Sequence, residues 1–87
     1  MKEFIKAFGN ITRVKILACL FEKEKNVSDL IGNCRLSQSA VSQHLKKLKE
    51  IGIIDCELFG RERFYKLKNK KAGAIAKEIL SLINNKK

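Results

Sequence analysis

The spacing of apolar residues along the first part of the chain is that of helices. One short apolar stripe ends near Gly9, and Asn10 is a suitable N-cap for a second helix with a broad apolar face. Asn26 is placed to cap a third, short helix, which Gly32 and Asn33 end. The pattern therefore predicts three closely spaced helices before residue 34.

A fourth helix is predicted between Ser37, its expected N-cap, and Gly52, a glycine suited to a left-handed stop. Successive side chains on a helix turn by about 100°. This places the following residues on one apolar side: Ala40, Val41, His44, Leu45 and Leu48. The other side carries Gln38, Ser39, Ser42, Gln43, Lys46 and Lys49. This pattern is typical of a helix whose apolar face packs on its own domain and whose polar face enters the DNA major groove.

After Gly52 the pattern changes to the alternation of strands. Residues 53–59 and 62–67 flank Gly60 and Arg61, which predicts a hairpin. A last amphipathic helix is predicted from Ala72, Ile75, Ala76, Ile79, Leu80, Leu82 and Ile83. The fold class is therefore mainly α with a small β-hairpin, in the order four helices, hairpin, helix. The third and fourth helices make a helix-turn-helix, and the hairpin is its wing.

The length of 87 residues predicts one domain over residues 1–87. We find no proline, internal repeat or low-complexity linker in it. A domain of this size buries only about 60% of the surface of its unfolded chain. Association of the terminal helices with a second copy would therefore add stability.

Basic residues outnumber acidic ones, with 19 Lys and Arg against 9 Asp and Glu and a formal net charge of +10. Such a charge attracts polyanions, nucleic acid first and an anionic membrane surface second. A lysine-rich composition inherited from an AT-rich genome is the third explanation. Residues 35–71 hold ten basic and four acidic residues, so over half of the excess lies around the fourth helix and the hairpin.

No apolar run reaches membrane-spanning length, and residues 1–4 lack the apolar core of a signal peptide. We therefore expect a cytoplasmic protein with no membrane partner. Cys19, Cys34 and Cys56 are odd in number and widely spaced, which predicts no disulfide framework. Their default role is that of small buried hydrophobic residues, and thiol-based redox or soft-metal sensing is the alternative. With one histidine and no nucleophile–base pair or phosphate loop, we expect no enzyme and no cofactor.

In order and spacing, these segments resemble the ArsR/SmtB family of small winged-helix transcriptional repressors. The matching segments are residues 8–17, 27–30, 36–45, 52–54, 60–61 and 64–67. The family usually has a proline where Ile11 stands. The resemblance implies a homodimer held by the first and last helices. It also implies sequence-specific binding to a palindromic operator in double-stranded DNA, with half-sites about one helical turn apart.

The candidate DNA-binding residues are Gln38, Ser39, Ser42, Gln43, Lys46, Lys47, Arg61 and Arg63. Glutamine pairs with adenine in bidentate fashion and serine reaches base edges or phosphates, so the first four are expected to read bases. The resemblance places DNA contacts at the same four positions, and a solvated helix face is the alternative. The two lysines suit phosphates, and the two arginines suit minor-groove or backbone contacts. Arg63 is equally suited to pair with Glu57, and His44 is expected to be a hydrogen-bonded packing residue.

The resemblance also implies a metal switch in many relatives, but the usual ligands are missing here. One common site uses a Cys-Val-Cys-Asp-Leu pattern, where this chain has Asn26-Val27-Ser28-Asp29-Leu30. The other takes Asp and His from the last helix, which offers neither here. We expect no metal site of these types, and the sequence does not identify an inducer. The alternative function is a winged-helix module that binds RNA or another protein through the same basic face.

Overall fold

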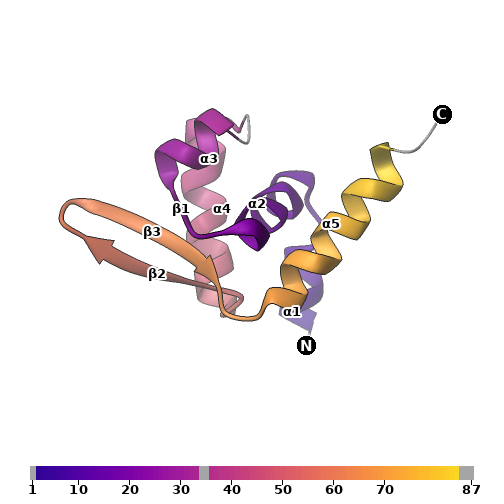
Figure 1. The fold of residues 1–87 in the computed structure, drawn as a ribbon. Helices are drawn as coiled ribbons and strands as arrows, with labels where there is room; N and C mark the ends of the chain where they lie inside the picture. Colours follow the sequence, from indigo (N-terminus) through magenta and orange to yellow (C-terminus); the bar gives the residue numbers. More distant parts are fainter. Residues whose placement is uncertain (1, 34–35, 85–87) are drawn as a thin grey trace.

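The computed structural model describes residues 2–33 and 36–84 (Figure 1). Its helices are α1 (Lys2–Ala7), α2 (Ile11–Glu22), α3 (Val27–Asn33), α4 (Gln38–Ile51) and α5 (Lys70–Asn84). Its strands are β1 (Lys25–Asn26), β2 (Ile54–Phe59) and β3 (Glu62–Leu67). The predicted order of helices and hairpin is confirmed. Strand β1 was not predicted, because two residues are too few to show an alternating pattern.

Local side-chain and backbone bonds set the ends of three helices where the sequence predicts them. The Asn10 side chain accepts hydrogen bonds from the backbone N–H groups of Thr12 at 2.9 Å and Arg13 at 3.2 Å, at the start of α2. The Asn26 Oδ1 accepts the N–H of Asp29 at 2.7 Å, at the start of α3. Gly52 ends α4 with φ 94°, a left-handed conformation that costs glycine little.

The expected cap at Ser37 is only partly right. Ser37 occupies the N-cap position of α4, and its carbonyl accepts the N–H of Val41 at 3.0 Å. Its hydroxyl makes no capping hydrogen bond. Because Ser37 is exposed, water can satisfy the free N–H groups at this end instead.

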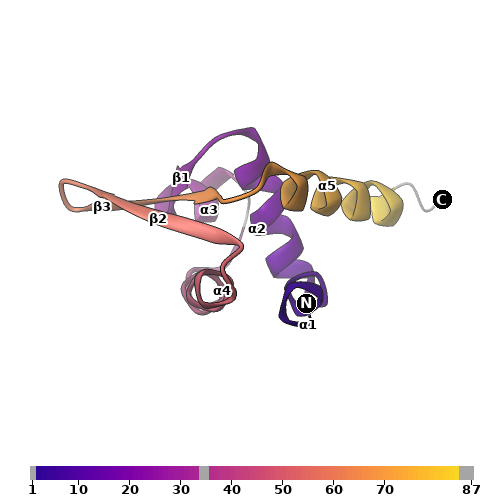
Figure 2. The same ribbon diagram turned by 90° about the horizontal axis from the view of Figure 1, so that it is seen from below.

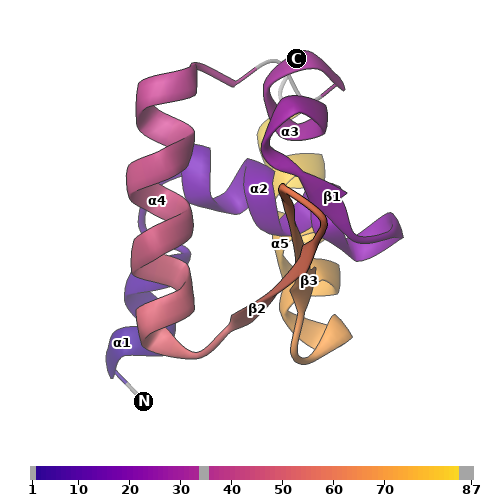
Figure 3. The ribbon, with the colours of Figure 1, turned by 90° about the vertical axis from the view of Figure 1, so that its left-hand side faces the viewer.

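The hydrophobic core is built around α2, which passes between α4 and α5 (Figures 2 and 3). The largest fully buried side chains are Ile16, Leu17, Leu30, Leu45, Leu48, Ile54, Val14 and Val41. They come from α2, α3, α4 and β2, so one core joins the predicted DNA-facing helix to the base of the hairpin.

Helix α5 lies very close to α2 at Gly73. A Cβ atom added there would be 2.6 Å from the Phe21 Cβ and 2.6 Å from the Leu67 Cδ1. No larger side chain fits at this point unless its neighbours move. Gly73 therefore sets the distance between α5 and α2.

The sheet has the order β1-β3-β2, and both pairs are antiparallel. The turn contains Gly60 with φ 63°, as the hairpin prediction requires. Lys25 in β1 is buried, and its Nζ donates a hydrogen bond to the backbone carbonyl of Cys19 at 2.8 Å. The short strand β1 thus ties the hairpin to α2.

Candidate nucleic-acid interface

The polar face of α4 is exposed, as its periodicity predicts. Gln38, Ser39, Ser42 and Gln43 are all exposed, and the other side of the helix buries Val41, Leu45 and Leu48. The buried side fixes the orientation of α4, because rotating the helix would expose these three apolar residues. The four polar side chains therefore lie together on one outward face.

His44 lies half-buried at one edge of α4, where it joins α4 to α2. Its Nδ1 accepts a hydrogen bond from the Arg13 Nε at 3.1 Å, and Arg13 also donates to the Lys6 carbonyl at 3.2 Å. Burial lowers the pKa of His44, and the positive charge of Arg13 lowers it further. The neutral imidazole is thus a hydrogen-bonded packing residue, the role that the sequence predicts.

The two lysines predicted as phosphate contacts lie on different flanks of α4. Lys46 lines a hollow of about 410 Å³ between α4 and the wing. Lys47 lines a smaller hollow of about 160 Å³ together with Lys6 and Glu50, on the side of α1. Both lysines have the same predicted role because they are neighbours in the chain. On a helix, however, neighbouring side chains point about 100° apart.

The wing extends away from the helices, and Arg61 is exposed at its tip beside Gly60 (Figure 1). Arg63 lies directly opposite Leu58 in the register of β2 and β3. Glu57 forms its ion pair with Lys66 instead, with 3.4 Å between Nζ and Oε1. The alternative pairing of Arg63 with Glu57 is therefore not formed.

The two faces of the wing differ in character because side chains alternate along a strand. One face carries the Glu57–Lys66 ion pair and the rings of Phe59 and Phe64, whose centroids are 5.6 Å apart at an interplanar angle of 78°. The opposite face, toward α4, carries Arg63.

Tyr65 is a candidate interface residue that the sequence analysis did not select. It lines the same hollow as Lys46 and Arg63, and it faces Cys56 across the hairpin. Burial raises the pKa of Tyr65, the neighbouring Cys56 raises it further, and Arg63 opposes the rise. The sequence signal for Tyr65 was its place two residues after Arg63, which puts both side chains on the same face of a strand.

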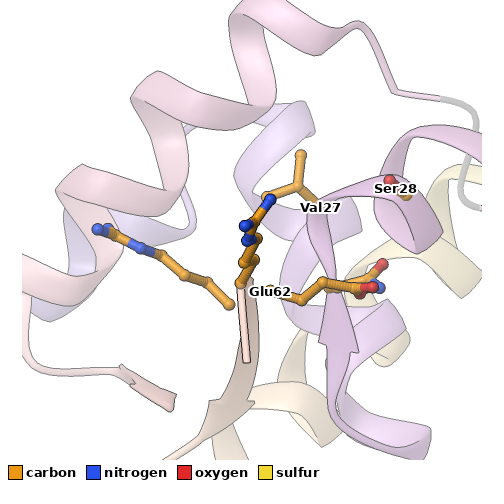
Figure 4. A pocket seen from close by; sticks show the side chains of 6 residues that line it. Val27, Ser28 and Glu62 are labelled. Carbon is orange, nitrogen blue, oxygen red and sulfur yellow. The ribbon is translucent and has the colours of Figure 1, made fainter. Parts of the chain in front are cut away.

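A second hollow, of about 290 Å³, lies between the wing tip and the start of α3. Its lining residues are Asn26, Val27, Ser28, Arg61, Glu62 and Arg63. In Figure 4, Val27 and Ser28 belong to the start of α3, and the Glu62 side chain extends from the wing toward β1. The Asn26 Nδ2 donates a hydrogen bond to the Glu62 Oε1 at 2.5 Å. Asn26 therefore caps α3 and holds the wing tip at the same time.

The cysteines differ from one another, and one differs from expectation. Cys56 is a half-buried free thiol, and Cys34 lies outside the described residues. Cys19 is half-buried in α2 and is disulfide-bonded, so the prediction of no disulfide is wrong. Spacing along the chain does not reveal which segments the fold brings together.

Within residues 2–33 and 36–84, no three His, Cys, Asp or Glu side chains gather in a group suited to a metal ion. In the same part of the chain, none of the helices combines the length and the apolar character that a bilayer span requires.

Comparison with known proteins identifies related regulators. Residues 10–55 match the sequence profile of the family described as "Bacterial regulatory protein, arsR family". The transcriptional activator HlyU of Vibrio cholerae is 35% identical over 71 residues, which cover 82% of this chain and 66% of HlyU. The transcriptional repressor SmtB of Mycobacterium tuberculosis is 37% identical over 65 residues, which cover 75% of this chain and 48% of SmtB. The chain thus spans about half to two thirds of the length of these relatives.

Solved structures agree with the sequence comparison. HlyU from Vibrio cholerae has a TM-score of 0.78 and 32% identity, over 92% of this chain and 87% of that structure. The transcriptional repressor BigR from Xylella fastidiosa has a TM-score of 0.81 and 25% identity, over 93% and 83% of the two chains. These likenesses confirm the predicted winged helix-turn-helix fold.

Proposed function

The chain belongs to the arsR family of bacterial regulatory proteins, and from this we propose that it is a sequence-specific DNA-binding regulator of transcription. One observation carries the proposal: the exposed polar face of α4 lies beside a wing that presents two arginines, Arg61 and Arg63. The matched relatives include both an activator and a repressor. Of the two, we propose repression, in which the bound protein occupies an operator.

In this proposal α4 enters the major groove, and Gln38, Ser39, Ser42 and Gln43 face the base edges. Glutamine forms two parallel hydrogen bonds with adenine, and serine bonds to bases or to phosphates. Arg61 at the wing tip reaches the adjacent minor groove or its backbone. Such arginine contacts add affinity at any sequence and make binding sensitive to salt.

The proposed active species is a homodimer that forms through α1 and α5. Large apolar side chains are exposed on or near these helices: Ile5, Ile11, Ile75, Leu82 and Ile83. If these side chains lie together on one surface, that surface is of the kind that another protein covers. Helix α5 lies at the end of the molecule opposite to the wing tip (Figures 1 and 2). A two-fold dimer built there directs two wings outward, which suits a palindromic operator with half-sites about one helical turn apart.

The test is selection of genomic DNA fragments, followed by binding to the selected duplex and to a scrambled duplex. Gln38→Ala combined with Gln43→Ala should lower the preference for the selected duplex at least about thirtyfold, because each of the two bidentate pairs discriminates by about 1–3 kcal/mol. Arg61→Ala should weaken binding to both duplexes by the same factor. A double variant that protects the operator as wild type does would contradict the base-reading roles. If no duplex is enriched, the basic face is better explained by RNA or protein binding.

The disulfide-bonded Cys19 favours a thiol-responsive form of this regulator. A solved structure of the relative HlyU is that of its reduced form, which supports the same idea. Reduction by a dithiol would release a constraint on α2, the helix around which the core is built. Operator affinity should then differ between oxidised and reduced protein, and Cys19→Ser should remove the difference. Identical binding curves for the two forms of the wild type would exclude this regulation.

A further inference from the structure

We propose that the hollow between α4 and the wing binds a phosphate group of the DNA backbone. The inference rests on the proposed function and deepens it by locating where one strand of the duplex is held. The lining residues are Val27, Ser42, Leu45, Lys46, Lys49, Arg63 and Tyr65. Lys49 and Tyr65 are new as DNA contacts, and Arg63 acts here on the backbone.

The polar lining comes from two regular elements that face each other. Ser42, Lys46 and Lys49 follow one another at intervals of four and three residues, so they form a single stripe along α4. Arg63 and Tyr65 are two residues apart in β3, so they lie on one face of the strand. The hollow is thus lined by polar groups on both sides, and the helix and the sheet hold those groups in place.

The side chains that line this hollow carry positive charges and no negative charge. None of the seven lining residues is acidic, whereas three are basic. Among the described residues, ion pairs join Lys66 to Glu57 and Lys77 to Glu22, and neither pair includes a lining residue. The acidic residue on the adjoining hollow, Glu62, is held by Asn26. An oxyanion that enters here meets three cations and no carboxylate of the lining.

Tyr65 adds a neutral donor among these cations. Burial and the neighbouring Cys56 raise the pKa of Tyr65, so its hydroxyl stays protonated at neutral pH. A protonated phenol can donate to a phosphate oxygen, as the Ser42 hydroxyl can from the facing helix. Arginine, lysine, serine and tyrosine are among the groups that contact DNA phosphates in complexes.

The geometry of duplex DNA favours a backbone phosphate as the group that occupies this hollow. The major and minor grooves are separated by one sugar–phosphate strand. If α4 lies in the major groove and the wing reaches the adjacent minor groove, that strand passes between α4 and the wing. The hollow between α4 and β3 would then lie at this crossing. A free phosphorylated ligand offers the same oxyanion chemistry, so the experiment must separate the two sources.

The test uses two variants: the double variant Lys49→Gln with Arg63→Gln, and the single variant Tyr65→Phe. Each is compared with wild type for binding to the duplex obtained by genomic selection. Affinity is measured over a series of salt concentrations. Each lost phosphate contact should reduce the slope of log K against log salt by about 1, so the double variant should lose about 2. The preference for the selected over the scrambled duplex should not change. The control is Lys66→Gln, which removes one positive charge from the opposite face of β3 and should keep the wild-type slope.

Neutral methylphosphonate groups placed at single positions of the duplex locate the contact. At the strand between the two grooves, this change should weaken binding by wild type several-fold and weaken binding by the double variant by a smaller factor, because the double variant has already lost two of the contacts to this phosphate. Tyr65→Phe removes one oxygen and keeps the ring, so its reduced affinity should come with an unchanged thermal unfolding midpoint.

Three outcomes would overturn the inference in different ways. If the double variant keeps the wild-type salt slope, the hollow does not hold the backbone. If, in addition, inorganic phosphate shifts the NMR signals of Lys49 and Tyr65 in wild type without DNA, the occupant is a free anion. If wild type itself binds no duplex, the proposed function fails and the inference fails with it.

Discussion

At the scale of single residues, His44 links the predicted DNA-reading helix to the rest of the molecule. Its imidazole accepts a hydrogen bond from Arg13 and so must be neutral at Nδ1. The same Arg13 donates to the carbonyl of Lys6, so one guanidinium joins α1, α2 and α4. Protonation of this one imidazole would therefore remove a hydrogen bond that joins α4 to α2.

Stability should fall in mild acid because of His44. The pKa of His44 is lowered below its ordinary value of 6.5 in the folded protein. A lowered pKa favours the folded state when the imidazole is neutral, so the contribution is complete above 6.5 and is lost as the pH falls through the folded pKa. Urea unfolding from pH 8 to pH 5 should show wild type losing stability relative to His44→Asn, which keeps an acceptor but does not titrate. Since the chain has one histidine, parallel curves for the two proteins would contradict this linkage.

At the scale of elements, the contact of α5 with α2 depends on Gly73. Gly73→Ala should destabilise the protein by about 1–3 kcal/mol, the usual cost of overpacking, although alanine is the better helix former. The reason is the 2.6 Å separation that a Cβ would have from the Phe21 Cβ. Gly32→Ala in α3 is the matched control, because a Cβ there meets nothing within 4 Å. Denaturant unfolding should show the control at or above wild-type stability, and equal effects of the two changes would refute the close approach.

The elements were predictable from sequence to the extent that each has its own period or stop signal. The helices follow from apolar spacing. Gly52 and Gly60 mark the end of α4 and the turn of the hairpin, and both have positive φ. Contacts between distant segments leave no such signal. The strand β1 pairs Asn26 with Phe64. This pairing joins residues that are far apart in the chain, so the alternation within either segment does not predict it.

The candidate site shows the same division. The exposed face of α4 follows from helical geometry, since exposure of Gln38 and Gln43 is a property of one element. The hollow beside it needs two elements, so Tyr65 and Lys49 were not selected as contacts. Arg63 was left between two roles because its face depends on the register of β2 and β3, in which it lies opposite Leu58.

At the scale of the whole molecule, the exposed apolar side of α5 should control association. Ile75 is 49% exposed and Ile83 is 48% exposed, two turns further along the same helix. Ile75→Glu combined with Ile83→Glu should convert a dimer into a monomer in sedimentation experiments and lower operator affinity. Leu58→Glu is the matched control, because Leu58 is 64% exposed on the wing, away from α5. Dissociation by the control, or a dimer that survives the double change, would place the interface elsewhere.

The position of β2 in the sheet also bears on how the protein behaves at high concentration. With the order β1-β3-β2, one side of β2 is an edge, and an open edge invites pairing with strands of other copies and so aggregation. Asp55 accepts the N–H of Cys56 at 3.0 Å through its own Oδ1, so one backbone donor of this strand is already occupied. Glu57 adds a second carboxylate to the strand. We therefore expect these two acidic side chains to disfavour edge-to-edge pairing of β2 with a second copy.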